Sequence, residues 1–441
     1  MKNFSKIAVV IFSGMLFSMM CEYPQISTAE PVIISDETLR IEKHFAGPVK
    51  PTSMAFIALN EFLILERNEG KVYRVTNGEM DSKPFLDVNV ATDGYRGMLG
   101  ITVSAGLNST NIFLYFTEAN AKDGDDTDKS NSRELLGNRL YKYEWKDNEI
   151  VNPKLLLDLP ALPGPRHPGG IVAVGPDNNL YVTVGDIDGT FREDYETMAQ
   201  NYQNGSSPDG RSGILRVTQD GKPVGNGIIG NEFLLNLYFA YGIRNSFGID
   251  WDPVTGNLWD TENGPHYGDE INLVEPGFNS GWANVQGIWK PNLDEKGELS
   301  LNPQNLVDFD GNGKYSSPEL TWIPPVAPTA LKFFNSDKLG SQYKNDLFVA
   351  DANTGSLYHF DLNENRTELE LLGLLEDKIA NSIDETRDVI FANGFGRITD
   401  LEIGPDGYLY VLSSEDDGAV LYKISKAANR MLVKKFEKNP K

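Results

Sequence analysis

The sequence predicts an all-β fold, a six-bladed β-propeller built of four-stranded antiparallel blades. Three observations predict it: a strand–turn–strand pattern recurs six times, the turns are rich in Gly, Pro, Asn and Asp, and helical periodicity of useful length is hard to find. A single blade cannot bury both of its faces, so we expect the repeats to close into one ring that folds as a unit.

Each repeat begins with a short apolar run, passes a polar turn and enters an aromatic-rich strand, as in "IVAVGPDNNLYVTVGD". The period-two alternation indicates strands, and several repeats add a third strand after a glycine. The repeats occupy residues 54–75, 99–119, 171–186, 247–264, 330–362 and 398–424. The longest insertions, expected as loops on the faces, are 119–137, 187–212 and 283–320. A pair of β-sandwiches divided near residue 200 is the alternative fold, and the repeated register of turn and strand favours the propeller.

The N-terminal segment, residues 1–29, has the features of an export signal. Lys2 and Lys6 precede an apolar run, and the small residues of 27–29 suit a cleavage site. The apolar run is shorter than the roughly 20 residues that span a bilayer. We therefore expect a cleaved signal and a periplasmic, extracellular or cell-surface protein, with an uncleaved N-terminal anchor as the alternative.

The remaining chain is predicted to hold one propeller, residues 30–427, followed by a basic C-terminal tail, residues 428–441. The net charge of −23 repels nucleic acid and anionic membranes, because phosphate binding needs clustered Lys and Arg. We expect no nucleic-acid partner and no membrane insertion after signal removal, whereas the many carboxylates offer ligands to hard cations. The only cysteine is Cys21, so the mature chain would contain no disulfide.

A histidine stands beside a proline and two glycines just before the third repeat, in "RHPGG". Glycine and proline favour an exposed turn, so His167 is expected to point from a loop into a shared space. An imidazole titrates near neutrality and can accept a proton at working pH. From these residues alone, an ordinary loop histidine is favoured over a functional one.

Colinear motifs from about residue 38 to 425 resemble the soluble glucose/sorbosone dehydrogenases, the pyrroloquinoline-quinone (PQQ)-dependent aldose sugar dehydrogenases. The motifs are "RGMLGITV" (96–103), "HPGG" (167–170), "GPDNNLYVTVGD" (175–186), "YGIRNSFGIDWDPVTGNLW" (241–259), "TENGPHYGDEINLVEPGFNSGW" (261–282), "PPVAPTAL" (324–331) and "GRITDLEIGPDGYLYVL" (396–412). The resemblance implies an exported enzyme that oxidises an aldose or related carbohydrate to a lactone. Hydride would pass to a Ca²⁺-bound PQQ, and an external acceptor would take the electrons.

The resemblance also assigns roles to single residues. His167 matches the histidine that removes the proton of the sugar hydroxyl, and Gly169-Gly170 would let the backbone approach a flat cofactor or sugar. Arg244 and Asn245 match the pair that touches the quinone, where an arginine stabilises growing negative charge and an amide donates a hydrogen bond. Arg397 matches a basic residue of the cofactor site.

The segment "NGPHYGDE" (263–270) matches the calcium segment of the family. The backbone carbonyls of Gly264 and Pro265 would bind the calcium that polarises the quinone. Glu270 matches a carboxylate at a neighbouring structural calcium. Asp269 is left without a role.

The sequence departs from the family pattern at positions that would contact the tricarboxylate cofactor. Asn353 replaces a lysine, Thr399 replaces the second arginine of an Arg-x-Arg pair, Tyr95 replaces a glutamine and Ile171 replaces an arginine. Lost charged hydrogen bonds of about 1.5–3 kcal/mol each would weaken binding by orders of magnitude. Arg96 is a potential substitute cation.

A second calcium motif stands in "DFDGNGKYSSPE" (308–319), which fits D-x-[DN]-x-[DN]-G-x5-E. The expected ligands are Asp308, Asp310, Asn312 and Glu319. Pro318 and the strand-like sequence that follows are unusual for such a loop, so a plain acidic turn is the alternative.

Two functions from different classes therefore remain open. One is the PQQ-dependent dehydrogenase, and the other is a non-catalytic, calcium-stabilised propeller that binds a carbohydrate or a protein. A calcium-dependent lactone hydrolase lacks matching motifs along the chain.

Overall fold

The computed structural model describes residues 32–47, 49–105, 110–120, 135–190, 192–288 and 305–427. The chain separates into a unit of Met1–Glu30 and a unit of Pro31–Lys441, and every described residue belongs to the second. The predicted export signal and the predicted basic tail lie outside the described residues. Every helix within the described ranges is a 3-10 turn of at most seven residues, and none has the length and apolar character that crossing a bilayer requires.

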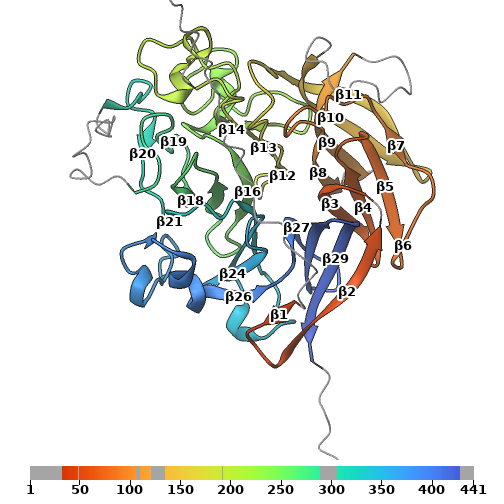
Figure 1. Cartoon of the computed structure of the whole chain (residues 1–441). Helices are drawn as coiled ribbons and strands as arrows, with labels where there is room; N and C mark the ends of the chain where they lie inside the picture. Colours follow the sequence, from red (N-terminus) through yellow and green to blue (C-terminus); the bar gives the residue numbers. More distant parts are fainter. Residues whose placement is uncertain are drawn as a thin grey trace, which may run out of the picture. The chain divides into compact units, whose positions relative to one another are not determined.

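The described strands form six sheets, and the innermost strands of these sheets surround a common centre (Figure 1). The inner strands are β3 (Pro51–Ala58), β8 (Met98–Ala105), β12 (Val172–Val174), β16 (Ser246–Trp251), β22 (Pro328–Phe333) and β27 (Arg397–Ile403). Each inner strand contacts the inner strand of the next sheet, except that β16 is contacted by β13 (Leu180–Val184) of the third sheet. The last inner strand, β27, contacts the first, β3. The sheets therefore close into a ring.

The first three sheets follow the chain outward from the centre. The first adds β4 (Glu61–Glu66), β5 (Lys71–Thr76), β6 (Glu79–Met80) and β7 (Leu86–Asp87) to β3. The second adds β9 (Thr110–Ala119), β10 (Leu135–Lys146) and β11 (Glu149–Leu159) to β8. The third adds β13 (Leu180–Val184), β14 (Gly213–Val217), β15 (Tyr238–Tyr241), β19 (Phe278–Asn279) and β20 (Lys314–Tyr315) to β12.

The other three sheets also start from their inner strands, but in the fifth and sixth the outermost strand comes from the N-terminal part of the described chain. The fourth adds β17 (Leu258–Glu262), β18 (Asp269–Val274), β21 (Leu320–Trp322) and β25 (Ile379–Ala380) to β16. The fifth adds β23 (Leu347–Asp351), β24 (Ser356–Phe360), β26 (Ile390–Asn393) and β1 (Ile33–Ile34) to β22. The sixth adds β28 (Leu409–Glu415), β29 (Gly418–Lys426) and β2 (Leu39–Gly47) to β27. The 3-10 turns are η1 (Glu193–Tyr195), η2 (Met198–Gln200), η3 (Leu235–Leu237), η5 (Ser341–Tyr343), η6 (Gly373–Leu375) and η7 (Ile383–Val389).

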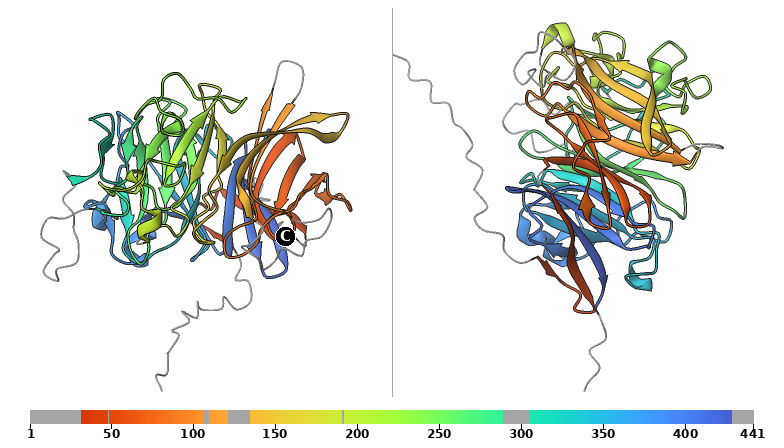
Figure 2. Two further views of the ribbon diagram at one scale, coloured as in Figure 1. Left: turned by 90° about the horizontal axis from the view of Figure 1, so that it is seen from above. Right: turned by 90° about the vertical axis from the view of Figure 1, so that its right-hand side faces the viewer.

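The sixth sheet joins the two ends of the described chain. Its outermost strand, β2, pairs antiparallel with β29, from Leu39 opposite Lys426 to Gly47 opposite Ala419. In Figures 1 and 2 this red N-terminal strand runs beside the blue C-terminal strands. The ring is thus closed by backbone hydrogen bonds as well as by side-chain packing.

The hydrophobic core lies between the sheets. Six clusters of buried apolar side chains each join two neighbouring sheets, so that Phe62 of β4 packs with Leu421 of β29, and Tyr115 of β9 packs with Val182 of β13. A sheet in this arrangement buries both faces against its neighbours, as radial repetition requires. The prediction of an all-β propeller is confirmed.

The prediction of four strands in every sheet is wrong, because the sheets hold four to six strands. The added strands, such as β6, β20 and β25, have only two residues each. They come from connecting segments that lie along outer strands and pair with backbone groups that an open sheet edge would leave exposed.

The inner strands all begin at one face of the ring, called here the mouth face. Near the starts of neighbouring inner strands, Thr52 donates a hydrogen bond to the carbonyl of Met98, and Thr329 donates one to that of Ile398. Because the strands of a sheet alternate in direction, the second strands end at the same face. A cavity of about 230 Å³ lies between the inner strands. Every inner strand contributes to its lining, and the lining residues include Ser53, Thr102, Ala173, Asp250, Lys332 and Glu402.

Candidate active site at the mouth face

His167 lies in the loop before β12 and contacts a carboxylate that the sequence did not single out. Its Nδ1 is 2.6 Å from Oδ1 of Asp186, which follows β13 by two residues. His167 has a φ of 57° and is 8% exposed. A carboxylate accepts hydrogen bonds, so the contact places the imidazole proton on Nδ1 and leaves the lone pair on Nε2. Among the described residues, Nε2 of His167 has no hydrogen-bond partner.

Asp186 is held by several donors. Trp282 donates its indole N–H to Oδ2 at 3.0 Å, and the Thr190 hydroxyl donates to the same oxygen. Burial by itself would raise the pKa of Asp186, but the contacts with His167 and Thr190 hold that pKa below its ordinary value. The carboxylate is therefore ionised near neutrality and fixes the orientation of the imidazole.

Gly185 brings the His167 loop against the segment before β16. A Cβ atom at this position would lie 2.5 Å from the carbonyl oxygens of both His167 and Arg244. Gly169 and Gly170 are also required by packing, because their Cβ atoms would collide with the backbone of Thr183 and the side chain of Leu99. The two glycines thus fit the loop against the protein's own strands, and a close approach of their backbone to a ligand stays a prediction.

Arg244 lies immediately before Asn245 and β16, and its side chain reaches the predicted calcium segment. Nη1 donates to the carbonyls of Asn263 at 2.8 Å and Gly264 at 2.9 Å, and the guanidinium lies 5.4 Å from the ring centre of Trp282. Gly264 and the half-buried Pro265 follow β17 at the mouth face. A calcium ion at the Gly264 carbonyl would therefore require the Arg244 guanidinium to turn away, since the two cations repel.

Asn245 is buried, and its amide nitrogen is 3.4 Å from the side-chain oxygen of Asn263. Within the described part of the chain, the Oδ1 atom of Asn245 has no hydrogen-bond partner. A buried acceptor without a donor costs roughly 1–3 kcal/mol. This atom is therefore suited to receive a donor from a ligand.

Two buried glutamates lie behind Arg244, on β17 and β18. Ser280 offers its single hydroxyl proton to Glu262 at 2.6 Å and to Glu270 at 3.2 Å. Burial and the mutual repulsion of the carboxylates raise the pKa of Glu262 well above its usual value, and burial raises the pKa of Glu270 to about 8. The pair thus requires either a proton or a bound cation near neutral pH.

Asp260 on β17 belongs to the same buried group. It is fully buried, neither oxygen receives a well-aligned hydrogen bond from the described residues, and burial raises its pKa to about 7. Asn272 and Ser246 face it and oppose this rise only in part. The sequence offered no signal for Asp260 or Glu262, because both stand in an ordinary strand pattern.

The basic residues at the mouth face differ from those expected. Arg397 is exposed at the start of β27. A second arginine, Arg67, lies near it: burial of Arg67 and the charge of Arg397 lower the pKa of Arg67, and the charge of Glu66 opposes this change. Arg67 follows β4 and was missed by the sequence reasoning. Arg96 does not fit the role of a substitute cation, because its guanidinium is buried and donates to the carbonyls of Ala161 and Gly164.

The two substituted positions make only weak polar contacts. The Asn353 amide donates to the carbonyl of Pro325 at 3.2 Å, and the Thr399 hydroxyl lies 3.5 Å from the carbonyl of Leu412. Neither side chain carries a charge that replaces the missing lysine and arginine.

The acidic loop 308–319 does not gather its predicted ligands. Asp308, Asp310 and Asn312 are exposed, while Glu319 is buried and pairs with Lys378 at 2.8 Å. Within the described ranges, Asp308, Asp310 and Glu319 do not form a group whose ligand atoms all lie within 4.8 Å of one another. The calcium loop therefore stays a prediction, and Glu319 has a different partner in this geometry.

Comparison with known proteins identifies relatives along most of the chain. Residues 49–423 match the family described as glucose/sorbosone dehydrogenase. An aldose sugar dehydrogenase of Escherichia coli (strain K12) is 26% identical over 380 residues, covering 84% of this chain and 89% of that protein. Quinoprotein glucose dehydrogenase B of Acinetobacter calcoaceticus is 26% identical over 442 residues, covering 84% and 86%.

Solved structures share the fold. An oxidoreductase from Thermus thermophilus, described as a glucose dehydrogenase, has a TM-score of 0.64 and 26% identity, over 88% of this chain and 99% of the other. The PQQ-bound form of an aldose sugar dehydrogenase from Streptomyces coelicolor has a TM-score of 0.60 and 20% identity, over 88% and 98%. The match over residues 49–423 covers most of the chain, and the chain belongs to the glucose/sorbosone dehydrogenase family.

Proposed function

We propose that the protein is an exported quinoprotein-type dehydrogenase that oxidises an aldose or a related carbohydrate to a lactone, with His167 as the general base. Relatives named aldose sugar dehydrogenase and quinoprotein glucose dehydrogenase support the reaction class. The observation that carries the proposal is the 2.6 Å contact between Nδ1 of His167 and Asp186.

The contact explains how His167 would act. Asp186 holds the tautomer in which Nε2 is unprotonated, and Nε2 can then accept a proton from a sugar hydroxyl. The neighbouring carboxylate also stabilises the imidazolium that forms. The bound sugar would lose its hydroxyl proton to His167 and its hydride to the cofactor, and an external acceptor would reoxidise the cofactor.

The residues at the mouth face are of the right types to hold the cofactor. Arg244 and Arg397 offer cations to a carboxylate-bearing ligand, and Asn245 offers an amide with an unused oxygen. The carbonyls of Gly264 and Pro265 would hold calcium once Arg244 releases Gly264. When bound, PQQ would supply a hydride acceptor that calcium polarises.

Glu270 is proposed to bind a neighbouring structural calcium ion through its carboxylate. Its proximity to Glu262 through Ser280 supports this role, because a divalent cation would remove the repulsion that otherwise keeps the pair protonated. The predicted ligands Asp308, Asp310, Asn312 and Glu319 are a separate and weaker calcium proposal.

A non-catalytic, calcium-stabilised propeller that binds a carbohydrate or a protein is the second candidate function. It is favoured by Asn353 and Thr399, whose side chains contact backbone carbonyls and supply no charge for a tricarboxylate. The family fold would then persist without the redox chemistry.

Calorimetric titration of PQQ into calcium-loaded protein separates the two functions. A dehydrogenase should show saturable binding, a bound-cofactor absorption band, and aldose-dependent reduction of a dye. Replacing His167 with Gln should nearly abolish turnover while PQQ affinity is kept. The matched control is His44→Gln on the outer strand β2, which should leave turnover unchanged. Absence of PQQ binding at high concentration would remove the redox function and leave the binding protein.

Two further proposals concern the chain as a whole. We count each of the six sheets as one blade, which the closed order of the inner strands supports. Export rests on residues 1–29, and N-terminal sequencing of the mature protein tests whether this segment is removed or kept as an anchor.

A further inference from the structure

The hairpin of β23 and β24 places three potential metal ligands on one of its faces. Leu347 pairs with Phe360, and Phe348 pairs with His359. Asp346 and Asp361 are the next residues outward, so they stand opposite each other at the open end of the hairpin. Side chains alternate between the faces of a strand, and Asp346, His359 and Asp361 therefore share a face.

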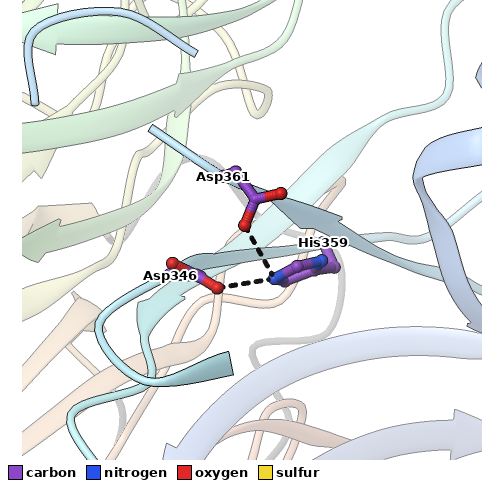
Figure 3. Close-up of side chains that lie close together, drawn as sticks. All are labelled: Asp346, His359 and Asp361. Carbon is purple, nitrogen blue, oxygen red and sulfur yellow. Dashed lines mark hydrogen bonds and ion pairs between the residues drawn. The ribbon is translucent and has the colours of Figure 1, made fainter. Parts of the chain in front are cut away.

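The three side chains converge on one point (Figure 3). Nε2 of His359 is 3.0 Å from Oδ2 of Asp346 and 3.9 Å from Oδ1 of Asp361. One ligand atom from each residue lies within 4.8 Å of the others. Ligand atoms about 2.0–2.1 Å from a tetrahedral ion are separated by roughly 3.3–3.4 Å, so only small side-chain movements would enclose a cation.

A simple ion pair accounts for only part of this arrangement. A proton on Nε2 can be donated to one carboxylate at a time, yet two carboxylates approach the same nitrogen. Along the described ranges, neither Asp346 nor Asp361 forms an ion pair with a lysine or arginine. Glu370 adds a further negative charge nearby. The cluster thus lacks positive charge.

The imidazole is held in place by aromatic side chains. Tyr343 and Phe348 have ring centres 5.1 Å from that of His359, and Phe391 lies 6.3 Å away. This packing fixes Nε2 toward the two carboxylates. The Asp361 side chain is 61% exposed, so water can reach the remaining coordination positions.

We propose that Asp346, His359 and Asp361 bind one divalent transition-metal cation, with Zn²⁺ as the representative ion. Imidazole together with carboxylates favours such a cation over Ca²⁺, which prefers oxygen ligands alone. The site is separate from the mouth face, because β23 begins at Leu347 beside the cluster and ends at Asp351 beside the Asn353 loop. The cation would join the start of β23 to the end of β24.

The test uses the full-length protein, stripped of metals with a chelator and then saturated with Ca²⁺, so that calcium sites are filled. Isothermal titration should show one Zn²⁺ per chain, Co²⁺ should give a visible absorption band, and Zn²⁺ should raise the melting temperature. The variant His359→Gln should weaken Zn²⁺ binding by about 100-fold or more, since loss of outer-shell partners alone costs about 10- to 100-fold.

The matched control is His44→Gln. His44 also packs edge-on against a tyrosine, but its charged neighbours are Lys423 and Asp406, and among the described residues it belongs to no group of three ligands. This variant should bind Zn²⁺ like the wild type. Asp361→Asn, at an exposed position, should weaken binding at least about 10-fold and provides a test if His359→Gln does not fold. Equal Zn²⁺ affinity in the wild type and in both cluster variants, or no stoichiometric binding by the wild type, would overturn the proposal.

Discussion

Two histidines of this protein contact aspartates, and the two contacts differ in geometry and in burial. His167 meets one carboxylate through Nδ1, in a loop where Asp186 is almost completely buried. His359 meets two carboxylates through Nε2, at a half-exposed hairpin end. The first arrangement leaves one ring nitrogen open to a substrate, whereas the second directs three ligand atoms to one point.

The difference shows that a His–Asp contact has no fixed function. In the first case the carboxylate selects a tautomer and creates a base. In the second case a further carboxylate makes the same contact a potential metal site. The two contacts differ in the face of the propeller on which they lie and in the number of hydrogen-bond acceptors around the imidazole.

The largest expected effect comes from Asp186→Asn. The amide can donate to Nδ1 and so favour the wrong tautomer of His167, and turnover with an aldose should fall by about 10³- to 10⁴-fold. PQQ affinity, measured by titration, should change little. Thr190→Val removes one donor to Asp186 and should cost less than about 10-fold, since a single hydrogen bond contributes roughly 1 kcal/mol. Undiminished turnover in the Asn variant would separate Asp186 from the chemistry.

The second largest effect is expected in the pH dependence of the free energy of unfolding, to which Asp260 should contribute more than Asp361. The pKa of Asp260 is about 7 in the folded protein, against an ordinary value of 3.8. The folded chain keeps a proton that the unfolded chain releases, so this group's stabilising contribution is complete below about pH 4 and is lost as pH rises through about 7. The loss is at most about 4 kcal/mol, from 1.36 kcal/mol per pKa unit.

Asp260→Asn should remove this group's share of the slope, measured by denaturant unfolding at pH 5 and pH 8, while the shares of Glu262 and Glu270 remain. Asp361→Asn should change the slope less, because its side chain is mostly exposed. A wild-type free energy of unfolding that rises between these pH values, and is unaffected by Asp260→Asn, would contradict the assignment.

The smallest effect is expected at the acidic loop. If the loop binds calcium, Asp310→Ala should lower the melting temperature by a few degrees in calcium and not in chelator, since about 1 kcal/mol corresponds to roughly 2–4 °C in larger domains. An equal change in both conditions would make the loop a plain acidic turn. Because Glu319 already pairs with Lys378, we expect the change in melting temperature to be small.

The sequence predicted the strands better than the contacts between sheets. The turn-and-strand repeats revealed the propeller because strand periodicity is a local property. The number of strands in each sheet was not predictable, since two-residue strands such as β20 and β25 exist only through pairing with distant segments. The sequence indicated that Gly169 and Gly170 need to be glycine, but the residues that they pack against, Thr183 and Leu99, are known only from the folded ring.

The sequence predicted those residues of the candidate site to which the family motifs assign a role. His167, Arg244, Asn245, Gly264 and Pro265 stand in motifs, and the ring brings their segments together at the mouth face. Asp186, Glu262 and Ser280 could not be assigned, because their partners lie 18 or 19 residues away in the chain and come close only in the folded structure. Asp346 and Asp361 flank a hairpin whose register aligns them, and that register was not available from spacing alone.

The pairing of β2 with β29 has a consequence for biosynthesis. The innermost contacts of each sheet form between segments close in sequence, but the last sheet must wait until the final strand has been made. Until then β2 presents an unpaired edge, and the apolar cluster around Phe62 lacks the residues that β28 and β29 supply. A nascent chain that has not yet made β28 and β29 therefore exposes an unpaired strand edge and an incomplete apolar cluster, and both features favour aggregation.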